Sequence, residues 1–405
     1  MRILISGASI AGPVLAYWLT RYGHGVTVVE RSPVLRKTGG HAVDLFGPAM
    51  EISERMGVLP KIESMATGTD RMTVYRDGVR KPTTVDLTKI FQATSDRHVE
   101  IMRDDLSEIY YDATLNDVEY VFGDSITSIS ADGEVSFDNA EQRSFDLVVG
   151  ADGLHSNVRN LVFGEVDKHW IGAYLAVLSV PNTAGLAGEM LGHLAVGRMV
   201  GIYGARHLGD ARVVMLFRTG QELDYHYRDT ARQKQLLREQ LAGMHPDVDG
   251  WLAQLDDGGA FYFDSITQLR QDTWSRGRVT LVGDAAYCPG PAVGGSTSIA
   301  VIGAYVLAGE IARAGTDHAK AFAAYEREML PLVRESRKMA ATMAKTIIPS
   351  SRFGMWALSR GAQLVTALPT PVARWLAKLN SGGLRSLDEF VVQDYSSRSD
   401  SVTHA

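Results

Sequence analysis

The sequence predicts an α/β fold in which a Rossmann-like nucleotide-binding domain carries an inserted antiparallel-sheet domain and ends in C-terminal helices. Three observations support this prediction. Residues 1–30 have the pattern of a strand, a glycine turn, a helix and a second strand. Two later apolar strands each run into an Asp-Gly or Gly-Asp pair, at the edge where α/β sheets bind ligands. Residues 169–270 instead contain long strands that fit no nucleotide-binding unit.

The first thirty residues predict a dinucleotide-binding βαβ unit. Their turn matches G-x-G-x-x-G with serine at the middle glycine position, and consists of Gly7, Ala8, Ser9, Ile10, Ala11 and Gly12. Gly7 permits a tight turn, Gly12 permits close helix–strand packing, and free N–H groups at the helix start suit a pyrophosphate. Glu30 follows about 20 residues on, where an acid accepts hydrogen bonds from ribose hydroxyls. Together these features favour dinucleotide binding over a unit that only packs.

Residues 31–44 allow two interpretations. Gly39 and Gly40 indicate a backbone that passes close to a ligand, with Arg36 nearby, whereas a solvated loop explains the same composition. After a helix at 48–56, the segment 72–87 predicts a hairpin that turns at Asp77-Gly78 and leaves the nucleotide-binding pattern.

The pattern returns at residues 99–112, where a helix begins beside Arg103. This arginine either reaches a bound anion or pairs with a neighbouring carboxylate. After short strands at 118–137, a buried strand at 145–149 leads into Asp152 and Gly153. Asp152 therefore lies at the ligand-binding edge of the sheet, or it only caps the next helix.

The inserted domain is predicted from four long strands and one or two helices. The strands are expected at 169–181, 193–204, 211–219 and 261–270, and the helices at 225–244 and 246–255. Alternation in the third strand places Val213, Met215 and Phe217 on one face. That face is either plain core or the apolar wall of a substrate pocket.

A last parallel strand at 278–282 runs into Gly283 and Asp284. The loop that follows holds Pro291, Gly294 and Gly295, and a helix from Ser296 to Ala314 directs its positive end back at that loop. Further helices are expected at 319–343, 353–365 and 371–379, before a polar tail at 396–405.

Composition restricts the class of protein. A chain of 405 residues with 45% hydrophobic and 22% charged residues predicts a soluble protein of about two domains. The net charge of −6 argues against nucleic acid or an anionic membrane as partner. Cys288 is the only cysteine, which excludes an intrachain disulfide and a cysteine metal cluster. The first strand leaves no room for a signal peptide, and the apolar segment 299–312 is too short to span a membrane. We expect a cytoplasmic protein.

The three motifs together resemble the FAD-dependent aromatic hydroxylases, the class A flavoprotein monooxygenases. The glycine turn, the Asp-Gly pair with Ser156 and Arg159, and Gly283-Asp284 have the order and spacing of that family. FYFDSITQLR, WSRGR, GDAAYCP and GAYVLAGE look most like the tetracycline-inactivating members, the tetracycline destructases. One departure is Gly294-Gly295-Ser296-Thr297-Ser298, where those enzymes usually have G-x-G-x-N, so the loop beside the flavin is expected to differ in shape.

The resemblance implies a division into domains. Residues 1–71, 97–168 and 271–345 would bind FAD, 72–96 and 169–270 would bind substrate, and 346–395 would form a C-terminal helical segment. The residues implied to bind the cofactor are Gly7, Ser9, Ile10, Ala11, Gly12, Glu30, Arg31, Arg36, Arg103, Asp152, Gly153, Gly283, Asp284, Pro291, Gly294, Gly295 and Ser296.

Within that set the resemblance assigns roles. Glu30 would bind the adenosine ribose and Asp284 the ribityl hydroxyls, and Arg103 would lie between the ribityl and pyrophosphate groups. His41 would lie near the flavin, where it contacts flavin or substrate, although a solvated loop histidine is the alternative. With Met215 and Phe217, His41 completes the candidate substrate-binding set. No base is assigned, and we find no signature of a metal site or a Ser–His–Asp triad.

The implied activity is hydroxylation of a polycyclic aromatic or enolic compound, with FAD as cofactor, NADPH or NADH as reductant and molecular oxygen as co-substrate. The family reaction proceeds through a flavin C4a-hydroperoxide, and the substrate would include tetracyclines. The alternatives are a hydroxylase of another polyketide or a simple phenol, a flavin-dependent reductase that does not activate oxygen, and a flavin-binding protein without turnover.

Overall fold

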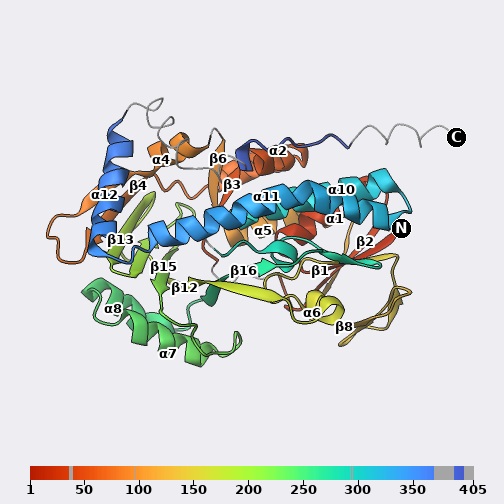
Figure 1. Cartoon of the computed structure of the whole chain (residues 1–405), viewed down its shortest axis with the longest axis horizontal. Coiled ribbons are helices and arrows are strands. Elements are labelled where there is room, and N and C mark those ends of the chain that lie inside the picture. Colours follow the sequence, from red (N-terminus) through yellow and green to blue (C-terminus); the bar gives the residue numbers. More distant parts are fainter. Residues whose placement is uncertain (36–39, 96, 292, 294, 369–386, 396–405) are drawn as a thin grey trace.

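The computed structural model describes residues 1–35, 40–95, 97–291, 293, 295–368 and 387–395. These residues form two large sheets with helices packed on them (Figure 1). One sheet is built from the segments with the nucleotide-binding pattern, and the other from the inserted segments. This mixed α/β architecture confirms the predicted fold class.

The first large sheet has six strands in the order β17-β18-β11-β1-β2-β7, parallel throughout except between β17 and β18. Its strands are β1 (Arg2–Ser6), β2 (Gly25–Glu30), β7 (Glu119–Phe122), β11 (Leu147–Gly150), β17 (Ser275–Arg276) and β18 (Val279–Leu281). Every residue of β11 and β18 is buried, as expected of strands covered on both faces. Because β1, β11 and β18 are parallel neighbours, the three motifs that follow them meet at one edge.

Among the described residues, eight helices pack around this sheet. We call the sheet together with these helices the cofactor domain, after the role that the sequence predicts for it. The helices are α1 (Ala11–Arg21), α2 (Gly47–Arg55), α3 (Leu59–Ser64), α5 (Arg103–Asp112), α6 (Asn157–Phe163), α9 (Asp284–Tyr287), α10 (Ser296–Ala314) and α11 (His318–Ile347). In Figure 1, α10 and α11 lie along the sheet beside α1. The small antiparallel pair β3 (Ala42–Phe46) and β6 (His98–Met102) lies next to them, and β8 (Ile126–Ile129), β9 (Glu134–Phe137) and β10 (Arg143–Ser144) form a separate meander.

Helix α10 is long and apolar enough to cross a membrane by length and composition. The expectation that this segment is too short was therefore wrong. However, 78% of its apolar window is buried inside the structure, where α10 packs against α1, α2 and α11. A helix that is apolar all round is also typical of a buried core helix, and the packing favours that interpretation.

The second large sheet has seven strands in the order β16-β12-β15-β14-β13-β4-β5. Its strands are β4 (Arg71–Arg76), β5 (Thr83–Asp86), β12 (Asp167–Pro181), β13 (Glu189–Ala195), β14 (Arg198–Tyr203), β15 (Asp210–Arg218) and β16 (Phe261–Arg270). The predicted hairpin of residues 72–87 enters this sheet through parallel pairing of β4 with β13. The same sheet thus contains strands from 72–96 and from 169–270, and the exact domain boundaries stay a prediction.

Two helices cover one face of this sheet. Leu237 and Leu241 of α7 (Thr230–Leu241), with Val248 and Leu252 of α8 (Pro246–Ala253), enclose an apolar core against the strands. A 3-10 turn, Gln254–Asp256, follows α8. The opposite face packs against the C-terminal part of α11, so it is the face that meets the cofactor domain.

The expectation of a single strand at 193–204 was wrong. The chain reverses between β13 and β14, and Gly197 has φ +73°, a left-handed conformation that glycine adopts without steric cost. The apolar residues on both sides of this turn read as one continuous run. The short elements α3, α4 (Leu87–Thr94), α9 and β3 were also not predicted, because each is too short for a clear period.

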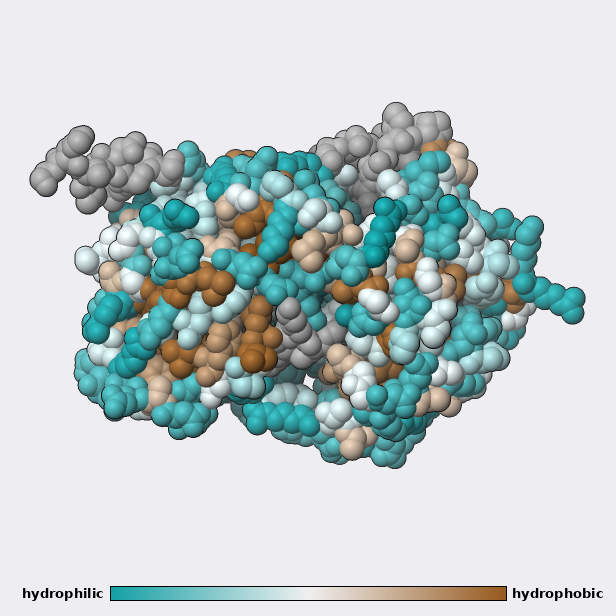
Figure 2. All heavy atoms as spheres, turned by 180° about the vertical axis from the view of Figure 1, so that it is seen from behind, coloured by the Kyte–Doolittle hydropathy of each residue, from teal (hydrophilic) through white to brown (hydrophobic). Residues whose placement is uncertain are grey.

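The chain ends with a helix and an extended segment. Helix α12 (Arg352–Ala367) packs against β5 and α4, and therefore covers an edge of the seven-stranded sheet. The helix expected at 371–379 lies outside the described residues, as does the tail. Residues 387–395, which we call the C-terminal return, lie against the cofactor domain, where Leu387, Val392 and Tyr395 are buried. Figure 2 shows apolar side chains on the reverse face, on both sides of a hollow near the middle of the molecule.

Candidate cofactor site

The glycine turn after β1 is a tight cradle in which two positions have no room for a side chain. Gly7 has φ +109°, and a Cβ at this position would lie 2.5 Å from the carbonyl oxygen of Ala151. A Cβ at Gly12 would overlap the carbonyl oxygen of Gly7. Helix α1 begins beyond Ile10 with no side-chain cap and no acid in its first turn, so its first N–H groups are open to an anion. The cradle therefore fits the pyrophosphate of a dinucleotide.

Ser9 departs from the glycine pattern, and the structure shows where its side chain goes. Nη2 of Arg103 donates a hydrogen bond to Ser9 Oγ at 3.0 Å, and Ser107 Oγ donates to the carbonyl oxygen of Ser9 at 3.1 Å. Arg103 therefore lies beside the glycine turn at the start of α5, where its guanidinium can bind phosphate oxygens. Sequence reasoning left an anion or a carboxylate as its partner, and the described contact is with the turn itself.

Glu30 lies at the end of β2, against the same turn. Its Oε2 accepts from the N–H of Ala8 at 3.0 Å, and its Oε1 accepts from the N–H of Ser32 at 2.9 Å. These bonds hold the carboxylate at the mouth of the cradle, and each oxygen keeps a lone pair for a ribose hydroxyl. Arg31 beside it is exposed, and Arg36 lies outside the described residues.

Asp152 caps α6. One carboxylate oxygen accepts from the hydroxyl of Ser156, and the other accepts from the backbone N–H of Asn157 at 2.8 Å and of Val158 at 3.1 Å. Burial raises the pKa of Asp152, and these hydrogen bonds oppose the shift. The contacts of Asp152 are therefore those expected of a residue that stabilises the start of the next helix. Gly153 follows with φ +82° and open space around it.

Arg159 joins two of the motifs. Its side chain is completely buried, its Nη1 donates to the carbonyl oxygen of Ala285 at 2.9 Å, and its Nη2 donates to that of Leu154 at 2.5 Å. The carbonyl of Ala285 belongs to α9, which follows β18, and the carbonyl of Leu154 belongs to the loop that follows β11. Arg159 therefore fixes the spacing between the Asp-Gly loop and the Gly-Asp loop.

Gly283 and Asp284 follow β18 close to the start of α1. Gly283 has φ +66°, and a Cβ there would lie 3.3 Å from the Cβ of Ala11. Asp284 opens α9, burial raises its pKa, and the Arg103 guanidinium opposes that shift. The two charged groups therefore lie near each other on one side of the cradle, where a carboxylate suits ribityl hydroxyls.

The start of α10 closes the site. Gly295 caps this helix in a left-handed conformation, φ +63°, and a Cβ there would lie 2.8 Å from Leu387 Cδ1 of the C-terminal return. Ser296 begins the helix, which has no side-chain cap and no acid in its first turn. Pro291 is buried, whereas Gly294 lies outside the described residues.

The three candidate substrate residues divide into two groups. His41 precedes β3, its carbonyl oxygen accepts from the N–H of Arg103 at 3.1 Å, and burial lowers the pKa of its imidazole to about 4. It is therefore neutral at pH 7 and belongs to the cofactor side. Met215 and Phe217 are completely buried in the core beneath α7 and α8.

The assignment of Met215 and Phe217 to a pocket wall was therefore wrong. Alternation correctly separated the two faces of β15, but it does not say which face meets the cofactor domain. The side chains on that face are Val214 and Leu216, which pack with Val293 of the cofactor loop. Neighbouring residues of a strand point to opposite faces, so Met215 and Phe217 lie on one face of β15 and Val214 and Leu216 on the other.

Sequence reasoning missed a His–Asp pair beside the Asp-Gly motif. Nε2 of His155 lies 3.0 Å from Oδ2 of Asp264, a carboxylate that is only 4% exposed. The hydroxyl of Tyr262 donates to the same oxygen at 3.4 Å. The sequence signal that could have indicated this pair is the acidic residue Asp264 within the predicted strand 261–270.

A cleft of about 660 Å³ opens beside the start of α5. Met102 and Asp105 line one side, and Pro181, Arg212 and Gly259 of the seven-stranded domain line the other. Its volume lies within the range of pockets that bind small molecules. The cleft therefore lies between the two domains, next to the start of α5.

Residues 1–339 match the model of a protein family described as FAD binding domain. The chain is 42% identical over 346 residues to an uncharacterised protein of Mycobacterium tuberculosis, covering 83% of this chain and 91% of that protein. It is 34% identical to a flavin-dependent monooxygenase of Legionella longbeachae, covering 86% and 90% of the two chains.

A solved structure supports the same family. The crystal structure of tetracycline destructase Tet(51) matches with a TM-score of 0.82 and 29% identity, and the match covers 97% of this chain and 99% of that one. The similarity thus includes the inserted sheet and the C-terminal segments as well as the nucleotide-binding core.

Proposed function

Because this chain belongs to the FAD-dependent monooxygenases, we propose that it uses NADPH or NADH and molecular oxygen to hydroxylate a planar, polycyclic aromatic or enolic compound. Tetracyclines are the first candidates. The observation that supports this substrate class is the match to tetracycline destructase Tet(51) over nearly the whole of both chains. A substrate domain of the same shape suits substrates of similar size.

The described residues fit FAD, and its pyrophosphate, ribose and ribityl parts have residues that would hold them. We assign the pyrophosphate to the cradle of Gly7 and Gly12, the adenosine ribose to Glu30, and the ribityl chain to Asp284 and Arg103. Bound FAD supplies hydride acceptance and oxygen activation, which no side chain provides. The start of α10 would place its positive helix end toward the flavin ring, where it stabilises negative charge on the reduced cofactor.

The protein then has to position the substrate and exclude water. The face of β15 with Val214 and Leu216, together with buried Tyr203, provides an apolar surface beside the cofactor domain. The hydroxyl of Tyr203 accepts from the N–H of Ala42 at 2.6 Å, so it joins this surface to the segment of His41. Neutral His41 can accept or donate one hydrogen bond to an enol or phenol.

The test is an incubation of the purified enzyme with NADPH, oxygen and tetracycline. We expect loss of the enol absorbance of the drug, a product heavier by one oxygen atom, and oxygen consumption that depends on the drug. Unchanged tetracycline, with NADPH oxidation stimulated by a simple phenol, would support the alternative hydroxylase. NADPH oxidation by an added electron acceptor, without oxygen consumption, would support a reductase. Absence of any NADPH oxidation would leave only flavin binding.

A further inference from the structure

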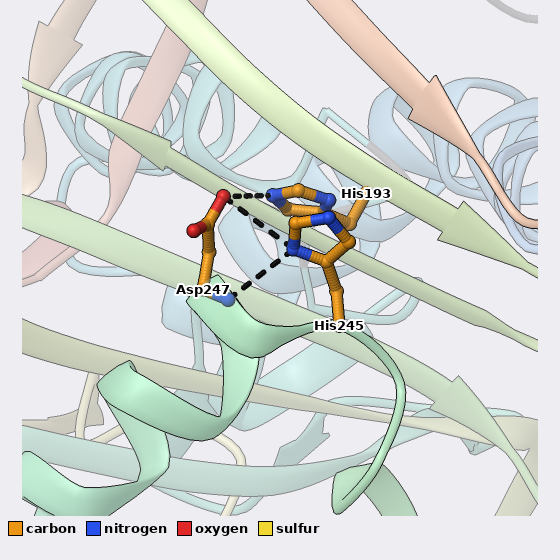
Figure 3. A group of neighbouring side chains, drawn as sticks. All are labelled: His193, His245 and Asp247. Atoms are coloured by element: carbon orange, nitrogen blue, oxygen red, sulfur yellow. Dashed lines mark hydrogen bonds and ion pairs between the residues drawn. The ribbon is translucent and has the colours of Figure 1, made fainter. Parts of the chain in front are cut away.

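Two histidines and an aspartate meet on the side of the seven-stranded sheet that faces α8, away from the cofactor site (Figure 3). His193 comes from β13, whereas His245 and Asp247 come from the start of α8. His193 Nε2 lies 3.1 Å from Asp247 Oδ2, and His245 Nδ1 lies 3.5 Å from the same oxygen. The two imidazole rings are stacked with centroids 3.9 Å apart.

These separations match the spacing of ligand atoms around a metal ion. With zinc–ligand distances of about 2.1 Å, tetrahedral geometry places neighbouring ligand atoms roughly 3.4 Å apart. The two measured separations lie on either side of this value, and all three ligand atoms lie within 4.8 Å of one another. Imidazole and carboxylate are also ligands that zinc and neighbouring transition metals prefer.

His193 supplies an independent observation. It is 3% exposed, and its Nε2 has no hydrogen-bond partner among the described residues, because the carboxylate of Asp247 approaches outside hydrogen-bond geometry. Burial lowers the pKa of His193, the neighbouring His245 lowers it further, and the Asp247 carboxylate opposes this shift. A buried nitrogen without a hydrogen bond is costly, and a cation between it and the carboxylate would remove that cost.

We propose that His193, His245 and Asp247 bind a divalent transition-metal ion, with Zn²⁺ as the first candidate and water as the fourth ligand. The ion would join α8 to β13. Tyr75, which lies opposite His193 on β4 and stacks on its ring at 5.3 Å, would shield one side of the site. This role is structural and does not depend on the proposed function, because the cluster lies on the face of the sheet that packs against α8.

Three features oppose binding. The positive end of α8 disfavours a cation by roughly 0.3–1 kcal/mol, and Asp247 in the first turn offsets it. His245 Nδ1 now accepts the N–H of Asp247 at 3.2 Å, a long hydrogen bond that coordination would replace. The stacked rings must also turn slightly so that both lone pairs point at the ion.

The experiment uses untagged, full-length protein, because a histidine tag binds the same metals. After treatment with a chelator, Zn²⁺ is added in a calorimetric titration, and melting temperature is followed in parallel. We expect one Zn²⁺ per chain and a rise in melting temperature. His193→Phe keeps the stacked aromatic ring and His245→Asn keeps a helix-capping residue, and each should weaken binding by about 100-fold or more, since even second-shell losses weaken it 10- to 100-fold.

The matched control is His169→Gln, which removes an exposed histidine elsewhere on the same domain. It should leave both stoichiometry and affinity unchanged. FAD content serves as the measure of folding for all variants. Zinc binding that is absent in the wild type, or equal in the wild type and in well-folded His193→Phe and His245→Asn, would overturn the proposal.

Discussion

At the scale of single residues, the cofactor site depends on positions where a side chain cannot fit. Gly7 and Gly23 show this by contrast. Both have positive φ, but a Cβ at Gly7 would contact the backbone of Ala151, whereas a Cβ at Gly23 would meet nothing within 4 Å. Substitution at either position strains the backbone, and only substitution at Gly7 also clashes with the backbone of the Asp-Gly loop and so displaces the turn that we assign to the pyrophosphate.

We predict that Gly7→Ala weakens FAD binding at least tenfold, which corresponds to about 1.4 kcal/mol, and so lowers FAD occupancy. Gly23→Ala should keep wild-type occupancy, because it shares the strain but not the steric contact. The absorbance ratio of flavin to protein in the purified variants measures this. Equal flavin content in the two variants would show that Gly7 serves only the turn.

A second residue-scale prediction concerns pH. Burial lowers the pKa of His41 to about 4, and burial lowers that of His24 to about 4 as well, from an ordinary value of 6.5. Between pH 6.5 and about 4 these two histidines therefore bind fewer protons in the folded protein than in the unfolded chain, so their contribution to stability is complete above this window and falls as the pH decreases through it.

His41→Gln should reduce this dependence. We expect a smaller fall in melting temperature between pH 6.5 and 4.5 than in the wild type, when both are followed by circular dichroism. The variant His169→Gln, on the exposed end of β12, should keep the wild-type slope. Parallel curves for the wild type and His41→Gln would mean that the imidazole gains a proton without cost in the folded protein.

At the scale of elements, the C-terminal return supports the helix that closes the site. The hydroxyl of Tyr395 donates to Glu310 Oε1 at 2.9 Å, and its ring packs against Gly309, where a Cβ would overlap it. The hydroxyl of Tyr305 donates to the carbonyl oxygen of Gln393 at 2.7 Å. Through these contacts and the contact of Leu387 with Gly295, the C-terminal return packs along α10 as far as the N-cap of that helix.

We predict that Tyr395→Ala lowers the free energy of unfolding by about 3–5 kcal/mol, as expected for an aromatic side chain lost from a core. Val391→Ala is the control, because Val391 lies in the same segment and is 78% exposed; its effect should stay within about 0.5 kcal/mol. Urea denaturation of the two variants and the wild type provides the comparison. Similar midpoints for both variants would contradict the proposed support.

At the scale of the whole molecule, two sheets and the C-terminal segments surround a site for a large cofactor. A ligand that binds only the folded protein stabilises it by mass action, by about 2.7 kcal/mol at 100 times its dissociation constant. We therefore predict that the melting temperature of the flavin-free protein rises with the logarithm of the FAD concentration. Scanning fluorimetry with added FAD and with riboflavin, which lacks the pyrophosphate, measures it. A response to riboflavin as large as that to FAD would contradict a site built around the glycine cradle.

The sequence alone determined the parts that depend on local pattern. Hydrophobic period and turn chemistry within thirty residues predict β1, the glycine turn, α1 and β2, and the bounds expected for α10 agree with the structure. The fold class and the family resemblance follow from the order of such local units along the chain. These features need no knowledge of what packs against what.

Only the tertiary structure decided which distant segments meet. The parallel pairing of β4 with β13, the orientation of Met215 and Phe217 toward α7 and α8, and the bonds of Arg159 all join parts far apart in the sequence. Likewise, His193 meets His245 and Asp247 only after the sheet forms and α8 packs on it. Periodicity says that a strand has two faces. Which face meets the cofactor domain depends on packing across the whole molecule, because side-chain contacts between distant segments leave no local pattern.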